Sequence, residues 1–334
     1  MTAQGAFRQG LTRRRFVSIL AAASVAPLVS RRGVAGHVQT FDWEGIALGA
    51  HARLSLQHAN EGAAKSAIAA CLDEVARLEA IFSLHRSDSA LVRLNARGHL
   101  DAAPADLRVL LAEALILAER SAGAFDPTIQ PLWAVYAGHF SRPGADPHGP
   151  PKDALEKAKG RVGWRKVEID GATIRLCGPG MAVTLNGIAQ GYITDRVGDI
   201  LRERGFRHVL VDMGEQLALG PKWDGEAWRV GIGNPASPRT PLIELPLTGG
   251  AIATSGGYGY HFDPEGRFGH ILEPGAGAPA RRWASVTVLA ERATSADGLS
   301  TALSATPAER AAAVVPSDAR AYVIPSGSDR GHWL

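Results

Sequence analysis

The chain has 334 residues, of which 46% are hydrophobic, 21% charged and 6% aromatic, as in an ordinary soluble globular protein. This composition excludes a disordered, collagen-like or coiled-coil chain. Its 36 Lys and Arg residues exceed its 33 Asp and Glu residues, and the net charge of +3 would suit a nucleic-acid or anionic membrane surface. The excess lies in residues 1–36, which contain six arginines and no acidic residue, so the remainder carries 30 basic and 33 acidic residues. We therefore expect no nucleic-acid partner.

The N-terminal segment has the pattern of an export signal. Thr12–Val17 reads Thr-Arg-Arg-Arg-Phe-Val, an apolar run continues to Val29, and small residues surround Ala35, as in a twin-arginine signal peptide. A membrane anchor is the alternative, but the apolar run is about thirteen residues long and a span needs ~20. We therefore predict that residues 1–36 are a cleaved twin-arginine signal, that the Tat translocon is a partner during export, and that the protein is periplasmic.

Residues 37–334 are expected to form one domain, with a candidate subdomain boundary in a Gly-, Pro- and His-rich loop at 138–151. The spacing of apolar residues predicts helices at 61–82, 104–120, 188–204 and 296–304. Short β-like runs predict strands at 46–56, 164–169, 182–185, 208–213, 228–232 and 285–290. Because strands far outnumber crossover helices, we predict an α+β fold with largely antiparallel sheets.

The two cysteines, Cys71 and Cys177, lie far apart in sequence and lack the spacing of a zinc site or a redox pair. In an oxidising compartment they could form one disulfide bridge. We favour the alternative, in which both are buried thiols that pack as small hydrophobic side chains.

Two segments in the middle of the chain are candidates for ligand contacts. Ala124–Trp133 is apolar except for Asp126, which is followed by a proline and either contacts a ligand or caps a neighbouring backbone. Val183–Asp195 is predicted to run from a strand through a glycine-containing turn into a helix, and such a turn presents backbone N–H groups to a phosphate. It lacks the Gly-x-Gly-x-x-Gly fingerprint of dinucleotide-binding folds.

Two further segments lie near the C-terminus. Ser255 and His270 do not indicate a serine hydrolase, because the Gly-x-Ser-x-Gly elbow and a third triad residue are missing. Asp297 and Thr301 are four residues apart and therefore share one face of a helix, where their oxygens suit Mg²⁺. The alternative is that Asp297 caps the helix while Thr301 bonds to the backbone.

In chain order, six segments resemble the signature segments of the FAD:protein FMN transferase family known as ApbE: Ser89–Asn95, Ala124–Thr128, Gly187–Tyr192, Ala253–Gly256, His270–Pro274 and Ala296–Thr301. The resemblance runs from about Gly49 to about Leu303. It implies an ApbE-like (T-fold-like) arrangement of largely antiparallel sheets with packed helices. It also implies Mg²⁺-dependent transfer of FMN from FAD to a Ser or Thr hydroxyl of an acceptor protein, with release of AMP.

The resemblance also implies which residues form the site. Mg²⁺ would be held by the side chains of Asp297 and Thr301 and by the Gly187 carbonyl, with Thr294 nearby, and His270 would help to activate the acceptor hydroxyl. FAD contacts would fall on Leu48, His85, Ala124, Phe125, Asp126, Thr184, Gln190 and Ile271. The chain departs from the family pattern at four of its positions, with His85 in place of Tyr, Thr184 in place of Asp, Gln190 in place of Lys or Glu, and Gly257 in place of an acidic residue.

Three functions are consistent with these residues. The first is the flavin transferase, the second is a hydrolase that splits FAD into FMN and AMP at the same metal site, and the third is a non-enzymatic FAD-binding maturation factor. With its leader and its Thr184–Asp195 segment, the chain is similar to the exported NosX branch, which is associated with flavinylation of the membrane regulator that supports nitrous oxide reductase. The acceptor implied by this branch is a membrane-anchored NosR-like flavoprotein or a subunit of an electron-transfer complex.

Overall fold

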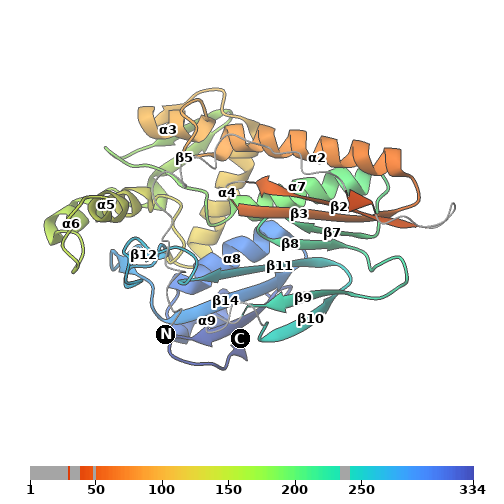
Figure 1. Cartoon of the computed structure of the whole chain (residues 1–334). Helices are drawn as coiled ribbons and strands as arrows, with labels where there is room; N and C mark the ends of the chain where they lie inside the picture. The colour runs from red at the N-terminus through yellow and green to blue at the C-terminus, as the bar shows by residue number, and fades with distance from the viewer. Residues whose placement is uncertain (1–28, 31–37, 48–49, 234–240) are drawn as a thin grey trace, which may run out of the picture.

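A nine-stranded antiparallel sheet forms the centre of the protein (Figure 1). The computed structural model describes residues 29–30, 38–47, 50–233 and 241–334, so most of the predicted signal segment and Leu48 lie outside the described residues. In spatial order the strands of this sheet are β1 (Val29–Ser30), β2 (Gln39–Ala47), β3 (Ala50–His58), β7 (Val209–Asp212), β8 (Gln216–Leu219), β11 (Gly250–Gly256), β14 (Trp283–Ala290), β15 (Arg320–Pro325) and β16 (His332–Trp333).

Three smaller sheets and eight α-helices complete the described part of the chain. The small sheets pair β4 (His99–Leu100), β6 (Thr173–Leu176) and β5 (Val167–Asp170); β9 (Trp228–Ile232) and β10 (Ile243–Leu247); and β12 (Leu272–Glu273) and β13 (Ala278–Pro279). The helices are α2 (Glu61–Phe82), α3 (Ala90–Arg97), α4 (Ala105–Arg120), α5 (Gln130–Phe140), α6 (Lys152–Lys159), α7 (Ala189–Glu203), α8 (Ala293–Ala305) and α9 (Ala308–Val314). None of these described helices is long and apolar enough to cross a membrane.

Alternate residues of the central strands face two different hydrophobic cores. On β11, Ala251 and Ala253 face the main core beneath α2, α7 and α8, whereas Ile252 faces the β9–β10 hairpin on the other side. This period of two is what a sheet with both faces covered requires. Helices α2, α7 and α8 therefore lie on one face of the large sheet and the β9–β10 hairpin lies on the other, as Figure 1 shows.

The predicted α+β class and the four predicted helices are confirmed. All the strand pairs between described residues are antiparallel. Helix α2 has the predicted bounds, α4 begins directly after Pro104, and α8 begins at Ala293, three residues earlier than predicted. Four helices, α3, α5, α6 and α9, were not predicted, and α5 includes the first residues of the expected loop at 138–151.

Several predicted strand bounds are wrong. The expected strand at 46–56 is a hairpin in which Ile46 at the end of β2 pairs with His51 near the start of β3. Residues 164–169 begin with a 3-10 turn, η1 (Trp164–Lys166), before β5. Strands β7, β9 and β14 occur where they were predicted, with small differences at their ends.

The predicted strand at 182–185 is absent, because other groups take its backbone hydrogen bonds. The Asn95 side chain donates to the Val183 carbonyl at 2.8 Å and accepts from the Val183 N–H at 2.7 Å. The Thr184 N–H donates to the Pro127 carbonyl at 2.8 Å. The segment is thus held in an extended form by a helix side chain and a loop, and not by a neighbouring strand.

The expectation for the cysteines is half correct. Cys71 and Cys177 are both free, so there is no disulfide bridge between them. Cys71 is fully buried on α2, as predicted, but Cys177 is exposed just after β6, where it does not pack as a core residue.

Candidate functional site

A single cleft of about 740 Å³ brings the predicted site residues together. Its walls come from α2, the α4–α5 loop, the start of α7, the end of β11 with the loop that follows it, and α8. The predicted residues that line the cleft are His85, Ala124, Phe125, Asp126, Thr184, Gly187, Gln190, His270, Ile271, Asp297 and Thr301. Leu48 is the one predicted contact that lies outside the described residues. The volume is within the range of pockets that bind small molecules and cofactors.

Asp297 lies at the buried end of the cleft, where α7 packs closely on α8. Its carboxylate accepts one hydrogen bond, from the backbone N–H of Gly191 at 2.9 Å. A Cβ atom at Gly191 would lie 2.3 Å from the Ala293 carbonyl oxygen and 2.8 Å from Asp297 Cβ, so only glycine allows this approach. Burial raises the pKa of Asp297 to about 7. A positive charge supplied from the cleft would favour the ionised carboxylate.

Glu215 is a second buried carboxylate in the cleft, and we did not predict it. It follows β7 in the turn to β8, and its pKa is raised by burial first and then by the negative charge of Asp297. The segment 208–213 is predicted as a strand. Nothing in its pattern indicates that Glu215, just after it, lies beside Asp297 on α8, more than eighty positions later. Arg86 is the only Lys or Arg among the described residues that line the cleft, and it is exposed and paired with Asp88.

Thr301 is held beside Gly187 and two serine hydroxyls. A Cβ atom at Gly187 would lie 2.8 Å from Thr301 Cγ2 and 3.1 Å from Thr301 Oγ1, so the turn before α7 approaches the Thr301 side chain directly. Thr301 Oγ1 lies 3.2 Å from Ser255 Oγ on β11, and Ser255 Oγ lies 2.7 Å from Ser300 Oγ. Ser300, and not Thr301, donates to the Asp297 carbonyl at 2.9 Å.

The helix-capping alternative for Asp297 is wrong, because Asp195 from α7 caps α8. Its carboxylate accepts from the backbone N–H groups of Ala293 at 2.8 Å and Thr294 at 2.9 Å. It also accepts from the Thr294 hydroxyl at 2.6 Å and pairs with Arg292 at 3.3 Å. Thr294, which the resemblance placed near the metal, is thus committed to this cap. Asp297 lies one turn further along and is free to serve the cleft.

The Asp126 side chain organises a loop, as its structural alternative predicted. One carboxylate oxygen accepts from the Thr128 N–H at 2.8 Å and hydroxyl at 2.6 Å, and the other accepts from the Trp164 N–H at 3.2 Å. Burial raises its pKa, although these three bonds act in the opposite direction. They fix the loop that carries Phe125 into the cleft. Any ligand contact at Asp126 would therefore come mainly from its backbone.

His270 lies on the loop before β12, opposite the α4–α5 loop. Its Nδ1 is 3.0 Å from the Tyr260 carbonyl, and because a carbonyl can only accept, Nδ1 carries the proton. Burial lowers the pKa of His270, so the ring is neutral at pH 7. Nε2 is therefore left with a lone pair that can accept a proton in the cleft. Ser255 bonds to Ser300 and Thr301, in agreement with our exclusion of a serine hydrolase.

Aromatic side chains form the wall of the cleft beside His270. Trp133 stacks on Tyr260 with ring centroids 6.2 Å apart and meets the edge of Phe262 at 5.2 Å. Tyr258 and Tyr260 are also exposed to solvent at 44% and 37%. This wall offers planar apolar surface to a ring system, while the opposite end offers oxygen atoms.

Two of the departures from the family pattern have defined environments. Thr184 accepts the Asn186 N–H at 3.2 Å, which tightens the turn before α7. The Gln190 side chain packs on Gly214, where an added Cβ would lie 2.4 Å from Gln190 Nε2 and the backbone has a φ of +101°. His85 is exposed at the rim of the cleft.

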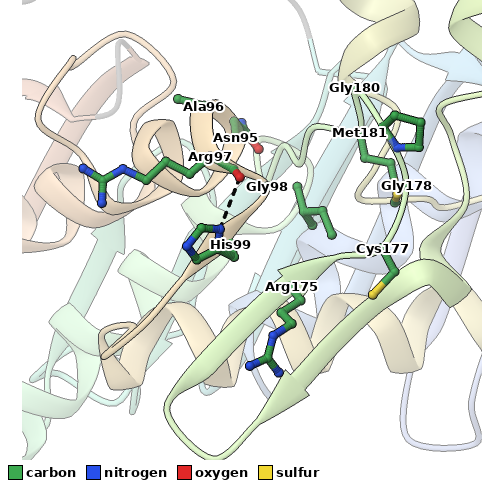
Figure 2. A pocket seen from close by; sticks show the side chains of 12 residues that line it. Asn95, Ala96, Arg97, Gly98, His99, Arg175, Cys177, Gly178, Gly180 and Met181 are labelled. Atoms are coloured by element: carbon green, nitrogen blue, oxygen red, sulfur yellow. Dashed lines mark hydrogen bonds between the residues drawn. The ribbon is translucent and has the colours of Figure 1, made fainter.

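A second hollow, of about 680 Å³, lies beside the small β4–β6 sheet (Figure 2). Arg97, His99 and Arg175 give it basic side chains, and His99 Nδ1 lies 3.3 Å from the Arg97 carbonyl. The exposed Cys177 is on its wall. None of the predicted site residues lines this hollow, although Asn95 at the end of the Ser89–Asn95 segment does.

The cleft residues fit a hard divalent cation. Among the described residues, no three or more His, Cys, Asp or Glu side chains form a cluster suited to a metal. The expected ligand set does not require one, since it combines one carboxylate, one hydroxyl and one backbone carbonyl. Asp297, Thr301 and Gly187 meet at one end of the cleft, and apart from Arg86 no Lys or Arg of the described residues lines the cleft. Oxygen donors of this kind suit Mg²⁺.

Fold and cleft together define an α+β enzyme with a cofactor-sized cleft that ends at buried oxygen donors. The ApbE family model matches residues 48–324. The chain is 33% identical over 258 residues to the FAD:protein FMN transferase of Treponema pallidum, covering 70% of each protein. It is 33% identical over 235 residues to the enzyme of the same name from Vibrio cholerae, covering 68% of this chain and 70% of that one. The chain belongs to the ApbE family.

Solved structures support the same fold. The ApbE protein of Thermotoga maritima superposes with a TM-score of 0.79 at 27% identity, covering 88% of this chain and 96% of that one. The flavin transferase ApbE from Vibrio cholerae superposes with a TM-score of 0.76 at 26% identity, covering 89% and 97%. The predicted ApbE-like fold is therefore confirmed.

Proposed function

We propose that this protein is a Mg²⁺-dependent FAD:protein FMN transferase. The observation that carries the proposal is that eleven predicted site residues, drawn from five separate regions between His85 and Thr301, line a single cleft. The names of its relatives support the same activity. In the proposed complex, the aromatic wall receives the flavin half of FAD and the oxygen-rich end receives the pyrophosphate.

Asp297, Thr301 and the Gly187 carbonyl would hold Mg²⁺. When bound, the cation would neutralise charge on the pyrophosphate oxygens, which favours displacement at phosphorus. The backbone N–H groups at the start of α7 add a positive partial charge near the same end of the cleft. Glu215 offers a further carboxylate oxygen there, and a bound cation would favour its ionised form.

His270 is the proton acceptor in the proposed reaction. Its Nε2 takes the proton of a Ser or Thr hydroxyl on the acceptor protein, and the hydroxyl oxygen then bonds to the phosphorus of the FMN half. The bond from that phosphorus to the AMP oxygen breaks, so AMP leaves and FMN stays on the acceptor. The hydrogen bond from Nδ1 to the Tyr260 carbonyl fixes the ring for this transfer.

One assay tests the proposal against its two alternatives. The purified protein is incubated with FAD, Mg²⁺ and a candidate acceptor domain, and the acceptor mass and AMP are measured. A gain of one FMN with one AMP supports the transferase. AMP without a mass gain supports the hydrolase, and FAD binding with neither product supports the maturation factor.

The proposed site of action is the periplasm, and the proposed acceptor is an exported or membrane-anchored flavoprotein such as a NosR-like regulator. The twin-arginine pattern of residues 12–17 supports this location. N-terminal sequencing of the exported protein tests it, with a mature terminus near Ala35 expected. A terminus that still contains Arg13 would contradict cleavage of the signal.

A further inference from the structure

Three hydroxyl groups form a chain of hydrogen bonds from the cleft into α8. Thr301 Oγ1 lies 3.2 Å from Ser255 Oγ, and Ser255 Oγ lies 2.7 Å from Ser300 Oγ. Ser300 Oγ lies 2.9 Å from the carbonyl oxygen of Asp297. Thr301 lines the cleft, whereas Ser300 is fully buried. The chain therefore has one end at the proposed cation and the other at a backbone acceptor.

The direction of each proton follows from the acceptor at the buried end. A hydroxyl has one proton to donate, and a carbonyl can only accept. Ser300 must therefore donate to the Asp297 carbonyl, so it can only accept from Ser255. Ser255 has then used its own proton and can only accept from Thr301.

This order points the Thr301 proton away from the cleft. The lone pairs of Thr301 Oγ1 are left to face the cleft, as a cation ligand requires, since a hydroxyl that turns its proton toward a cation repels it. A threonine inside a helix often donates to the carbonyl four residues earlier. Here that carbonyl is the Asp297 oxygen, which receives the proton of Ser300.

We propose that Ser255 and Ser300 are positioning residues that hold Thr301 as an acceptor-only ligand for the divalent cation. This inference rests on the proposed function, because it assumes that Asp297 and Thr301 bind Mg²⁺. Ser255 comes from β11, where it pairs with Val286 in register, so the central sheet sets the orientation of a helix side chain. Hydrogen bonds to metal ligands from such outer partners typically affect metal affinity 10–100-fold.

The test measures cation binding directly. Mg²⁺ is titrated into the purified protein by calorimetry, and Mn²⁺ binding is followed by electron paramagnetic resonance as a second readout. Ser255→Ala is expected to weaken both cations roughly 10–100-fold. Ser255→Thr keeps the hydroxyl and is expected to restore binding to within a few-fold. At saturating Mg²⁺, kcat is expected to recover in Ser255→Ala, so the loss appears mainly in the Mg²⁺ requirement.

Comparison of single and double variants shows whether a loss of Mg²⁺ affinity comes from breaking the hydrogen-bonded chain or from local disruption of packing. Ser300→Ala removes the acceptor of the Ser255 proton and is expected to weaken Mg²⁺ binding as Ser255→Ala does. The double variant is expected to be no weaker than the worse single variant, because both break one chain. Ser304→Ala is the matched control, since Ser304 is a buried serine of α8 that donates to the Ser300 carbonyl at 2.8 Å.

The outcomes distinguish two failures. If neither the wild-type protein nor the Asp297→Asn variant binds Mg²⁺, the metal site of the proposed function is wrong. If Asp297→Asn abolishes binding while Ser255→Ala binds like wild type, the metal site stands and the positioning role is overturned. Additive losses in the double variant, or an equal loss in Ser304→Ala, would also overturn the positioning role.

Discussion

Two buried aspartates, Asp195 from α7 and Asp297 from α8, lie at successive turns of α8 and have opposite environments. Asp195 accepts three hydrogen bonds from Ala293 and Thr294 at the start of α8 and forms an ion pair with Arg292. Asp297, one turn further along, accepts a single side-chain hydrogen bond from Gly191 and opens onto the cleft. Both carboxylates are shielded from bulk water, at 6% and 4% exposure.

The two environments show how a carboxylate buried to support the fold differs from one buried but open to a ligand. A buried carboxylate is costly unless donors or cations surround it. The protein itself supplies these to Asp195, so that residue has little capacity left for a ligand. Asp297 has unused capacity, and the cleft gives a cation access to it. The same residue type at the same depth therefore supports the fold in one case and is available for the proposed chemistry in the other.

The largest effect is expected from Asp297→Asn. Asparagine can still accept the Gly191 N–H but lacks the negative charge, so transfer is expected to fall at least ~10³-fold, with several kcal/mol of charge stabilisation lost. The unfolding midpoint is expected to stay equal or rise, because a buried charge is removed. Acceptor mass gain and urea unfolding measure the two effects. Wild-type activity in this variant would remove Asp297 from the metal site.

His270→Ala extends the comparison to the proton acceptor. Transfer is expected to fall about 10²–10⁴-fold, the usual contribution of a positioned base, with FAD affinity largely retained. Fluorescence titration of FAD alongside the transfer assay checks this. If FAD binding falls as much as transfer does, His270 positions the ligand and does not accept the proton.

The pH profile adds a second test of His270. Its pKa is lowered by burial, so the ring stays neutral below its usual value of 6.5 and becomes charged only at lower pH. At saturating Mg²⁺, where the bound cation would keep Asp297 ionised, the acidic limb of kcat/KM is therefore expected below pH 6.5, and it should disappear from the residual activity of His270→Ala. A limb above pH 7 would contradict this assignment.

Asp195→Ala is expected to do the opposite of Asp297→Asn: it should lower stability and leave activity largely intact. The start of α8 loses its cap and Arg292 loses its partner, which is expected to cost about 2–4 kcal/mol of unfolding free energy. Activity per folded molecule is expected to persist at saturating Mg²⁺. Asp199→Ala is the control on the same helix, since Asp199 is partly exposed and pairs with Arg202 at 2.7 Å. Its expected cost is below about 1 kcal/mol. Equal losses in both variants would contradict the structural role of Asp195.

Gly191→Ala perturbs both aspartates at once, with the smallest expected effect. The added methyl group meets the Ala293 carbonyl and Asp297 Cβ, so α7 and α8 must separate. Overpacking of this kind typically costs about 1–3 kcal/mol. Mg²⁺ affinity is expected to fall together with the unfolding free energy. A loss of stability without a loss of Mg²⁺ affinity would show that the two sites are independent.

Local signals explain what could be predicted from the sequence. The bounds of α2 follow from its apolar spacing and from Asn60, whose side chain accepts the Ala63 N–H at 2.9 Å. Asp297 and Thr301 were predicted as a pair because four residues bring two side chains to one helix face.

Contacts between distant segments explain what could not be predicted. Val183 is a β-branched residue of the kind found in strands, but its backbone hydrogen bonds are made with the side chain of Asn95, on a helix 88 positions earlier. Glu215 reaches the cleft only because β7 and β8 lie beside β11. Ser255 was considered as a nucleophile, and its contact with Thr301 depends on how β11 packs under α8. Periodicity and spacing report on neighbours along the chain and not on these pairings.

The different exposure of the two cysteines has a practical consequence for labelling. Cys71 is fully enclosed, and burial raises the pKa of its thiol to about 12, so it has almost no reactive thiolate at neutral pH. Cys177 is exposed and does not line the cleft. A maleimide dye should therefore attach at one position in the native chain without blocking FAD. Such a label would allow acceptor docking to be followed by energy transfer, with no cysteine substitution required.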